Sequence, residues 1–461
     1  ETPVLGDSGM IRVYDAVTDQ VVDSLDLSIP PGPTESRTYG PECDYTKVPY
    51  DYTRTVMPTN KDTRPGTPSG TAEPTPPVYQ LTIIGGFTDA FHFYPVIVRD
   101  SIATIYLHNN MLEYGHTYYV TIDNGVLNLA DGSFQGVTKE DEWVFTTKSD
   151  MLELSDTLIV DVAGKGDFNT VQGALDFIPD FNEQQTVILV NPGDYEELVY
   201  TRNKWHVKIK GAGMADTKVH YANNEVFNPH PLTVKTNEWP GTFPSRRAAF
   251  MLDNCKDIVI EDMTIATDLK GQAEGLLING ERIALYRVHI IGSGDALQAN
   301  GTIYMESCEL DGGGDTILGR GSLFAYKSNF RNGGGPFSWV RNTVGNHGNV
   351  FVECTFSTED GKQADYGRTK SNHGSAYPDA EFVLIDCKVK NIIPEGWSSI
   401  GAKIAKMYEY NTCDMVTGNP VDVSKRHPYS RQLTKDKDTE LINNYRNPAF
   451  VLKGWVPDSC I

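Results

Sequence analysis

The chain has 461 residues, 39% of them hydrophobic, and a formal net charge of −21 at neutral pH. This length predicts two or three domains, unless one repetitive solenoid takes up most of the chain. The negative charge disfavours nucleic acid and anionic membrane surfaces as partners, and no apolar run of roughly 18 residues could span a bilayer.

The seven cysteines are scattered along the chain without CxxC pairs or Cys/His clusters of zinc spacing. They are Cys43, Cys255, Cys308, Cys354, Cys387, Cys413 and Cys460. We expect buried thiols rather than a disulfide framework, and neither a metal nor a cofactor. The chain starts at Glu1 without a signal sequence, so we expect an extracytoplasmic protein whose signal peptide has been removed, with a trimmed chain as the alternative.

Residues 1–150 are predicted to form an all-β domain. Short β-branched and aromatic runs such as "MIRVYDA", "HTYYVTID" and "EWVFTTK" are separated by turn residues, which is typical of a β-sandwich. The proline-rich stretch 30–77 is predicted to be a long insertion or loop within it. This part resembles the immunoglobulin-like modules that precede catalytic domains in secreted bacterial enzymes, and we expect a spacer or docking role.

The second domain is predicted to begin near residue 155. The run "TLIVDVAGKGDFNTVQGALDFIP" indicates a strand, a glycine turn and an amphipathic helix with Val171, Ala174, Leu175 and Ile178 on one face. "GKGD" lacks the rest of a phosphate-binding fingerprint, so it is interpreted as a turn.

Six segments after residue 257 share one pattern, in which an apolar run is followed by polar, small, polar and apolar residues. They start at residues 258, 283, 303, 323, 349 and 382. The spacing between these starts is about 20 residues plus insertions, which is typical of a solenoid with variable loops on one side. The pattern aligns Met263, Val288, Cys308, Ser328, Cys354 and Cys387 in one column. We predict an all-β fold for residues 155–461, a right-handed parallel β-helix with this column inside.

Asp295 and Asp315 each follow one of these segments by five residues. Equivalent points on adjacent turns of a β-helix lie about 4.8 Å apart, so the two carboxylates could share a site. Such a pair could divide into an acid with a raised pKa and an ionised partner. The alternative is that both are ordinary turn residues, since Asp and Gly are common in turns.

The surrounding sequence resembles the pectin methylesterase family. "GSGDALQANGTIYMESCELDGGGDTILG" is similar to the segment with the family's two catalytic aspartates, and "VAGKGDFNTVQGALDFIP", "VNPGDYEELV", "GQAEGLLING", "DYGRTK" and "PEGW" match other markers in order. The resemblance covers about residue 157 to the C-terminus. It implies an esterase that removes methyl groups from methyl-esterified homogalacturonan without a metal.

The resemblance also implies roles for single residues. Asp315 is the nucleophile, Asp295 the general acid/base, Arg368 the residue that orients the nucleophile, and Gln272 a donor to the oxyanion. These roles suit the chemistry, because an arginine stabilises an ionised carboxylate by forked hydrogen bonds and an amide can stabilise an oxyanion.

The chain departs from the family pattern at several positions. Gly294 stands where the family has its second oxyanion-hole glutamine, so that donor is missing unless Gln298 or a backbone N–H replaces it. Thr316 and Leu318 replace two phenylalanines after the nucleophile. Thr369 and Lys370 replace the Pro-Trp after the arginine. We therefore expect altered substrate contacts, with Lys370, Trp339 and Trp397 as candidates.

Four other polar residues are predicted to be turn or surface residues rather than members of a site. His347 and His373 are expected to be turn residues rather than ligands. Arg246 and Arg247 could meet uronate carboxylates, but we expect ordinary surface charges.

We expect a monomeric pectin methylesterase with methyl-esterified pectin as its partner. Another β-helix pectinase would need either a calcium cluster with an arginine base or a glycosidic carboxylate set. The remaining alternative is an inactive β-helix that only binds pectin.

Overall fold

The computed structural model describes residues 2–32, 79–87, 90–150, 152–228, 246–370 and 377–458. The chain forms two compact units, Glu1–Leu154 with Val226–Thr233, and Ser155–Glu225 with Val234–Ile461. Most of the proline-rich stretch, Cys43, His373 and Cys460 lie outside the described residues. Residues 226–233 had not been predicted to belong with the N-terminal unit.

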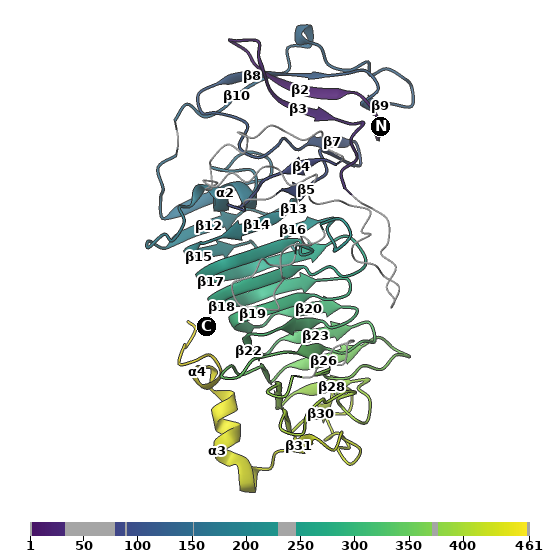
Figure 1. Cartoon of the computed structure of the whole chain (residues 1–461), viewed down its shortest axis with the longest axis vertical. Helices are drawn as coiled ribbons and strands as arrows, with labels where there is room; N and C mark the ends of the chain where they lie inside the picture. Colours follow the sequence, from purple (N-terminus) through teal and green to yellow (C-terminus); the bar gives the residue numbers. More distant parts are fainter. Residues whose placement is uncertain are drawn as a thin grey trace. The chain divides into compact units, whose positions relative to one another are not determined.

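The N-terminal unit is built from antiparallel strands (Figure 1). Its main sheet has the order β10 (Val144–Thr146), β8 (Thr117–Ile122), β2 (Met10–Asp15) and β3 (Val21–Asp26). Three further pairs are β1 (Val4–Leu5) with β9 (Leu127–Asn128), β4 (Leu81–Thr82) with β5 (Phe91–His92), and β6 (Val96–Arg99) with β7 (Ile102–Ile105). A short 3-10 helix, η2 (Lys139–Asp141), precedes β10. The immunoglobulin-like character stays a prediction.

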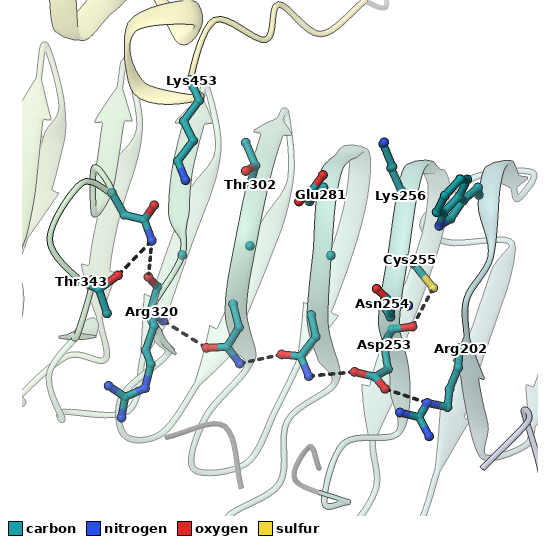
Figure 2. A pocket seen from close by; sticks show the side chains of 17 residues that line it. Arg202, Asp253, Asn254, Cys255, Lys256, Glu281, Thr302, Arg320, Thr343 and Lys453 are labelled. Carbon is teal, nitrogen blue, oxygen red and sulfur yellow. Dashed lines mark hydrogen bonds and ion pairs between the residues drawn. The ribbon is translucent and has the colours of Figure 1, made fainter. Parts of the chain in front are cut away.

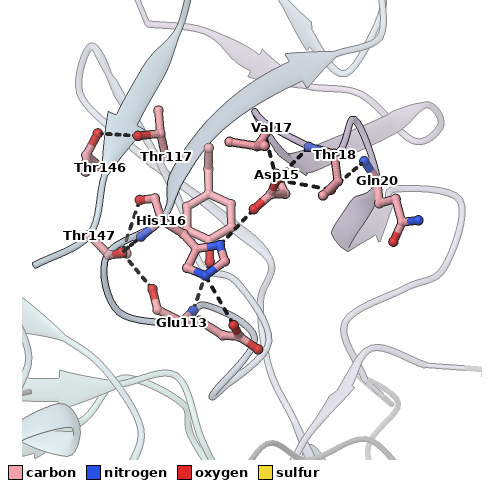
Figure 3. A network of polar contacts seen from close by, with 10 residues as sticks. Asp15, Val17, Thr18, Gln20, Glu113, His116, Thr117, Thr146 and Thr147 are labelled. Atoms are coloured by element: carbon pink, nitrogen blue, oxygen red, sulfur yellow. Dashed lines mark hydrogen bonds and ion pairs between the residues drawn. The ribbon is translucent and has the colours of Figure 1, made fainter. Parts of the chain in front are cut away.

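A polar network fixes the end of β2 beside the start of β8 (Figure 3). Nδ1 of His116 lies 2.8 Å from Oδ2 of Asp15. The other oxygen of Asp15 accepts hydrogen bonds from the backbone N–H groups of Val17 and Thr18. These bonds, that of His116 first, lower the pKa of Asp15 to about 2. Each of these hydrogen bonds connects a turn or a strand end of this unit, so the network stabilises the local structure.

The second unit is one continuous parallel sheet of 21 strands that coils from β11 to β31 (Figure 1). Its strands are β11 (Thr157–Val160), β12 (Thr186–Val190), β13 (Gly193–Glu196), β14 (Val199–Arg202), β15 (Trp205–Lys210), β16 (Thr217–Tyr221), β17 (Phe250–Thr267), β18 (Leu276–Ile291), β19 (Leu297–Glu306), β20 (Glu309–Gly312), β21 (Ile317–Gly319), β22 (Ser322–Tyr326), β23 (Asn329–Asn332), β24 (Ser338–Val340), β25 (Asn349–Val352), β26 (Thr355–Thr358), β27 (Glu381–Ile385), β28 (Lys388–Lys390), β29 (Lys406–Tyr410), β30 (Cys413–Asp414) and β31 (Ser430–Gln432). This is the predicted parallel β-helix.

One helix lies beside the first strands of the coil, and two more pack along its side. Helix α2 (Val171–Phe177) begins at Thr170, whose hydroxyl accepts from the N–H of Gly173, and it buries the predicted apolar face. Helices α3 (Lys435–Arg446) and α4 (Pro448–Val451) follow β31 and add Tyr445 and Val451 to a hydrophobic cluster that includes Tyr304. Within the described ranges, none of the helices is long and apolar enough to cross a membrane.

The predicted interior column is present. Met263 pairs with Val288 in parallel register, and the N–H of Cys308 donates to the hydroxyl of Ser328. All six members of the column are fully buried. Burial raises the pKa of the thiols of Cys308 and Cys354 to about 12, so the thiols act as small core groups.

A second ladder of side chains joins successive coils at one corner (Figure 2). Asn279 donates to Asp253 at 3.2 Å, Asn300 donates to Asn279 at 3.0 Å, and the N–H of Arg320 donates to Asn300 at 3.1 Å. Arg202 closes the ladder through an ion pair with Asp253 at 2.8 Å. The ladder lines a groove of about 790 Å³ that includes neither Asp295 nor Asp315, so its visible role is to hold the coils in register.

Candidate active site

Parallel register brings three carboxylates to equivalent positions on consecutive coils. Leu276 pairs with Leu297, and Leu297 pairs with Ile317. Glu274, Asp295 and Asp315 each lie two residues before one of these paired positions. We call these three residues the carboxylate column. The structure therefore places Asp295 and Asp315 beside each other, as their spacing predicted, and adds Glu274.

Arg368 holds Asp315 by two hydrogen bonds. Its Nε donates to Oδ1 at 2.9 Å and its Nη2 donates to Oδ2 at 2.6 Å. A parallel bridge to Trp339 in β24 places Arg368 one coil beyond that strand. The fork matches the two oxygens of a carboxylate, so the carboxyl group of Asp315 has one fixed orientation.

Trp339 and Lys370 surround this arginine. The guanidinium carbon of Arg368 lies 4.4 Å from the centre of the Trp339 ring, and that of Arg341 lies 4.3 Å from it. Lys370 has an exposed side chain, and its backbone carbonyl accepts from Nη1 of Arg368 at 3.1 Å. Trp339 thus supports the arginine that holds Asp315.

Asp295 lies in a buried, highly charged environment. Burial raises the pKa of its carboxyl group to about 7, and the negative charges of Glu274 and Asp315 act in the same direction. The charges of Arg247 and Arg341 oppose this rise. Asp295 can therefore exchange a proton near neutral pH, which is the property a general acid/base needs.

Asp365 is a second, partly buried acid near Asp315. Burial raises the pKa of Asp365 to about 6, and the charge of Asp315 adds to this effect. The backbone carbonyl of Asp365 accepts from the N–H of Phe337, one coil away. The sequence interpretation missed this residue, although it lies in the same "DYGRTK" motif as Arg368.

Arg247 is the largest departure from the sequence interpretation, because it is not an ordinary surface charge. Its Nε donates to both oxygens of Glu274 at 2.8 and 2.9 Å, and its Nη2 donates to Asp295 at 3.0 Å. Nη1 donates to the amide oxygen of Gln272. The Glu274 side chain is fully buried. The preceding residue, Arg246, is also buried rather than on the surface, with 2% exposure.

The three residues considered for the oxyanion hole lie in different settings. Gln272 is exposed next to Arg247. Gln298 is buried in β19, between Leu277 and Leu318 of the neighbouring strands. A Cβ atom at Gly294 would come 2.8 Å from the carbonyl oxygen of Gly271, so a glutamine cannot be added there without moving the backbone.

Two predicted roles are corrected. Trp397 has 0% exposure and packs in the core against Tyr366 and Phe382, with ring centres 5.1 and 6.1 Å away, so its indole has no surface for a polysaccharide. His347 is not a simple turn residue, because its Nδ1 lies 2.7 Å from the buried carboxylate of Glu381.

The sequence matches the Pectinesterase family over residues 157–453. The chain belongs to the pectinesterase family. The catalytic unit is therefore an ester hydrolase that acts on the methyl esters of pectin, as predicted, rather than a lyase or a polygalacturonase. Among relatives from Arabidopsis thaliana, Pectinesterase QRT1 is 27% identical over 322 residues, covering 65% of this chain and 80% of the relative. Probable pectinesterase 67 is 22% identical over 359 residues, covering 71% and 92%.

Solved structures show the same fold. Pectin methylesterase from carrot matches with a TM-score of 0.53 at 17% identity, covering 67% of this chain and 99% of the carrot chain. A pectin methylesterase in complex with a hexasaccharide matches with a TM-score of 0.50 at 18% identity, covering 67% and 100%. Both matches span about two thirds of this chain.

Proposed function

We propose that this enzyme hydrolyses the methyl esters of galacturonosyl residues in pectin through a covalent acyl-enzyme on Asp315. The observation that carries this proposal is the fork of Arg368 on Asp315, beside an Asp295 whose pKa is raised to about 7. One carboxylate is thus oriented for attack, and its neighbour can carry a proton.

The first half of the reaction forms the acyl-enzyme. An oxygen of the Asp315 carboxylate attacks the ester carbonyl carbon and forms a tetrahedral intermediate. The carbon–oxygen bond to the methoxy group then breaks, and protonated Asp295 gives its proton to that oxygen. Methanol leaves, and an anhydride joins Asp315 to the galacturonosyl carboxyl group.

The second half returns the enzyme to its starting state. Asp295, now ionised, takes a proton from a water molecule whose oxygen attacks the anhydride. The bond to Asp315 breaks, and the free uronate carboxyl group leaves with the water oxygen. Asp295 is protonated again, so one water is consumed for each methanol released.

The negative oxygen of each tetrahedral intermediate needs a donor. Gln272 is the best placed of the candidate amides, because its oxygen already accepts from Arg247 and its NH₂ group is the donor that remains. We propose that Lys370 and Trp339 contact the sugar chain, while Gln298 and Trp397 are excluded from this role by their burial.

Several features outside the site complete the proposal. We infer that the N-terminal unit is an immunoglobulin-like module of a bacterial enzyme, in keeping with its antiparallel sheets. We infer also that the protein works outside the cytoplasm and as a monomer. Sedimentation of the purified chain tests the last point, and a dimer mass would contradict it.

The test measures methanol release from highly methylated homogalacturonan, together with reducing ends and unsaturated products. We expect methanol without chain cleavage. Asp315→Asn keeps the side-chain volume and removes the nucleophile, so the rate should fall by about 10⁴-fold. Asp311→Asn is the matched control, because Asp311 lies four residues before Asp315 but pairs with His289 and Arg331 of the neighbouring coils. Substrate binding without methanol would identify an inactive pectin-binding protein instead.

A further inference from the structure

We propose that Arg247 is a positioning residue of the esterase, which orients both the Gln272 amide and the Asp295 carboxylate and so offsets the missing side chain at Gly294. This inference rests on the proposed function and adds the residue that organises its acid/base and oxyanion groups. The observation behind it is that a single guanidinium contacts both the proposed oxyanion donor, Gln272, and the proposed proton donor, Asp295.

The guanidinium of Arg247 is itself held in place. Glu274 is fully buried and accepts three hydrogen bonds from Arg247, two from Nε and one from Nη2 at 2.6 Å. The Arg247 side chain is only 16% exposed. A guanidinium anchored by a buried carboxylate loses little freedom when it makes further contacts, so its remaining donors have fixed directions.

The remaining N–H groups of Arg247 orient the Gln272 amide and the Asp295 carboxylate. The oxygen of the Gln272 amide faces Nη1 of Arg247, so the amide nitrogen faces away and is available to an oxyanion. Oδ2 of Asp295 accepts from Nη2, which leaves Oδ1 as the oxygen that exchanges a proton with substrate. Most of the Arg247 hydrogens are already used, so Arg247 acts through its neighbours rather than on the substrate.

The backbone explains why the site needs this arrangement. The N–H of Gly294 donates to the carbonyl of Gly271 at 2.8 Å, and a Cβ on Gly294 would meet that same oxygen. A side-chain donor is therefore excluded at residue 294. Arg247 reaches the site from the coil on the other side of Glu274.

Arg247 and Glu274 also influence the pKa of Asp295 through their charges. Arg247 lowers the pKa of Asp295 and Glu274 raises it, so removing either partner has a predictable and opposite effect. Arg247→Gln should move the alkaline limb of the kcat/KM profile to higher pH and reduce kcat by about 10- to 100-fold. Glu274→Gln should move the same limb to lower pH.

A conservative variant separates charge from orientation. Arg247→Lys keeps a positive charge but lacks the fork that reaches Glu274, Gln272 and Asp295 together. We expect its alkaline limb to stay near that of the wild type while kcat still falls. Arg282→Gln is the matched control, because Arg282 forms a similar fork with Asp257 on neighbouring coils, and its profile should be unchanged.

The pH–rate profiles of these variants, with thermal midpoints to confirm folding, distinguish failure of the proposed function from failure of the proposed role of Arg247. If the wild type releases no methanol, or Asp315→Asn remains active, the proposed function fails. If those controls behave as expected but Arg247→Gln and Glu274→Gln shift the limb in the same direction or leave it unmoved, the role of Arg247 is overturned. Opposite shifts support it, because a purely structural role would not reverse sign.

Discussion

The central guanidinium carbon of Arg368 lies 4.4 Å from the centre of the Trp339 ring. The same guanidinium donates two hydrogen bonds to Asp315. The indole and the carboxylate therefore both restrain this arginine, so the orientation of Asp315 depends on Trp339 through Arg368.

Removing the indole should loosen this arginine. We expect Trp339→Ala to lower kcat/KM by about 10- to 50-fold, because a misplaced catalytic group loses much of its effect, and Trp339→Phe to lower it much less. Initial rates of methanol release measure the effect. Trp143→Ala in the N-terminal unit, where Trp143 is 44% exposed, controls for the loss of a tryptophan. Equal rates for both alanine variants would contradict the prediction.

The reaction should slow at alkaline pH. In the proposed mechanism Asp295 must be protonated to give its proton to the departing methoxy oxygen, and its pKa is raised to about 7. The protonated fraction is high below that pH and falls about tenfold per pH unit above it, so kcat/KM should fall likewise. The measurement is a pH–rate profile corrected for uncatalysed ester hydrolysis. A level profile up to about pH 9 would show that Asp295 is not the proton donor.

The corner ladder should contribute to stability. Asn300 donates to Asn279 and accepts from Arg320, so Asn300→Ala breaks two bonds at once. We expect a loss of about 1–3 kcal/mol in the free energy of unfolding, measured by urea denaturation. Asn329→Ala removes a single exposed bond, with Thr355, and should cost no more than about 0.5 kcal/mol. A ladder variant as stable as this control would refute the interpretation.

The interior cysteines should resist alkylation in the native protein. Cys255, Cys308, Cys354 and Cys387 are buried, and burial raises the pKa values of their thiols. Cys413 is partly exposed and serves as the internal control. Among these five cysteines of the described residues, iodoacetamide followed by mass spectrometry should show modification of Cys413 first and of the other four only after unfolding. Rapid native modification of Cys308 would mean that the coil opens.

Much of the fold was predictable because a β-helix repeats its side-chain environment. The stacking of Cys308 on Ser328 follows from a sequence column, and so does the neighbourhood of Asp295 and Asp315. Extending the column back by one coil would also have found Glu274, which lies 21 residues before Asp295.

The remaining errors concern contacts that no local motif contains. Arg247 stands next to another arginine in a polar stretch, and only the coil brings it to Asp295, 48 residues later. Trp397 follows a Pro-Glu-Gly turn typical of a surface, yet its ring enters the core between Tyr366 and Phe382. Burial of a large side chain such as Trp397 requires space between side chains of other coils. The sequence around Trp397 alone does not show whether that space exists.

Asp295 and Asp315 come two residues before β19 and β21, which pair directly in the sheet. Backbone hydrogen bonds between these strands fix the spacing of the two chain segments at about 4.8 Å. Longer loops occur in other coils, such as the one between β28 and β29. In the proposed mechanism, loop lengths can therefore change which polysaccharide fits, while the spacing of the two strands that carry the aspartates stays constant.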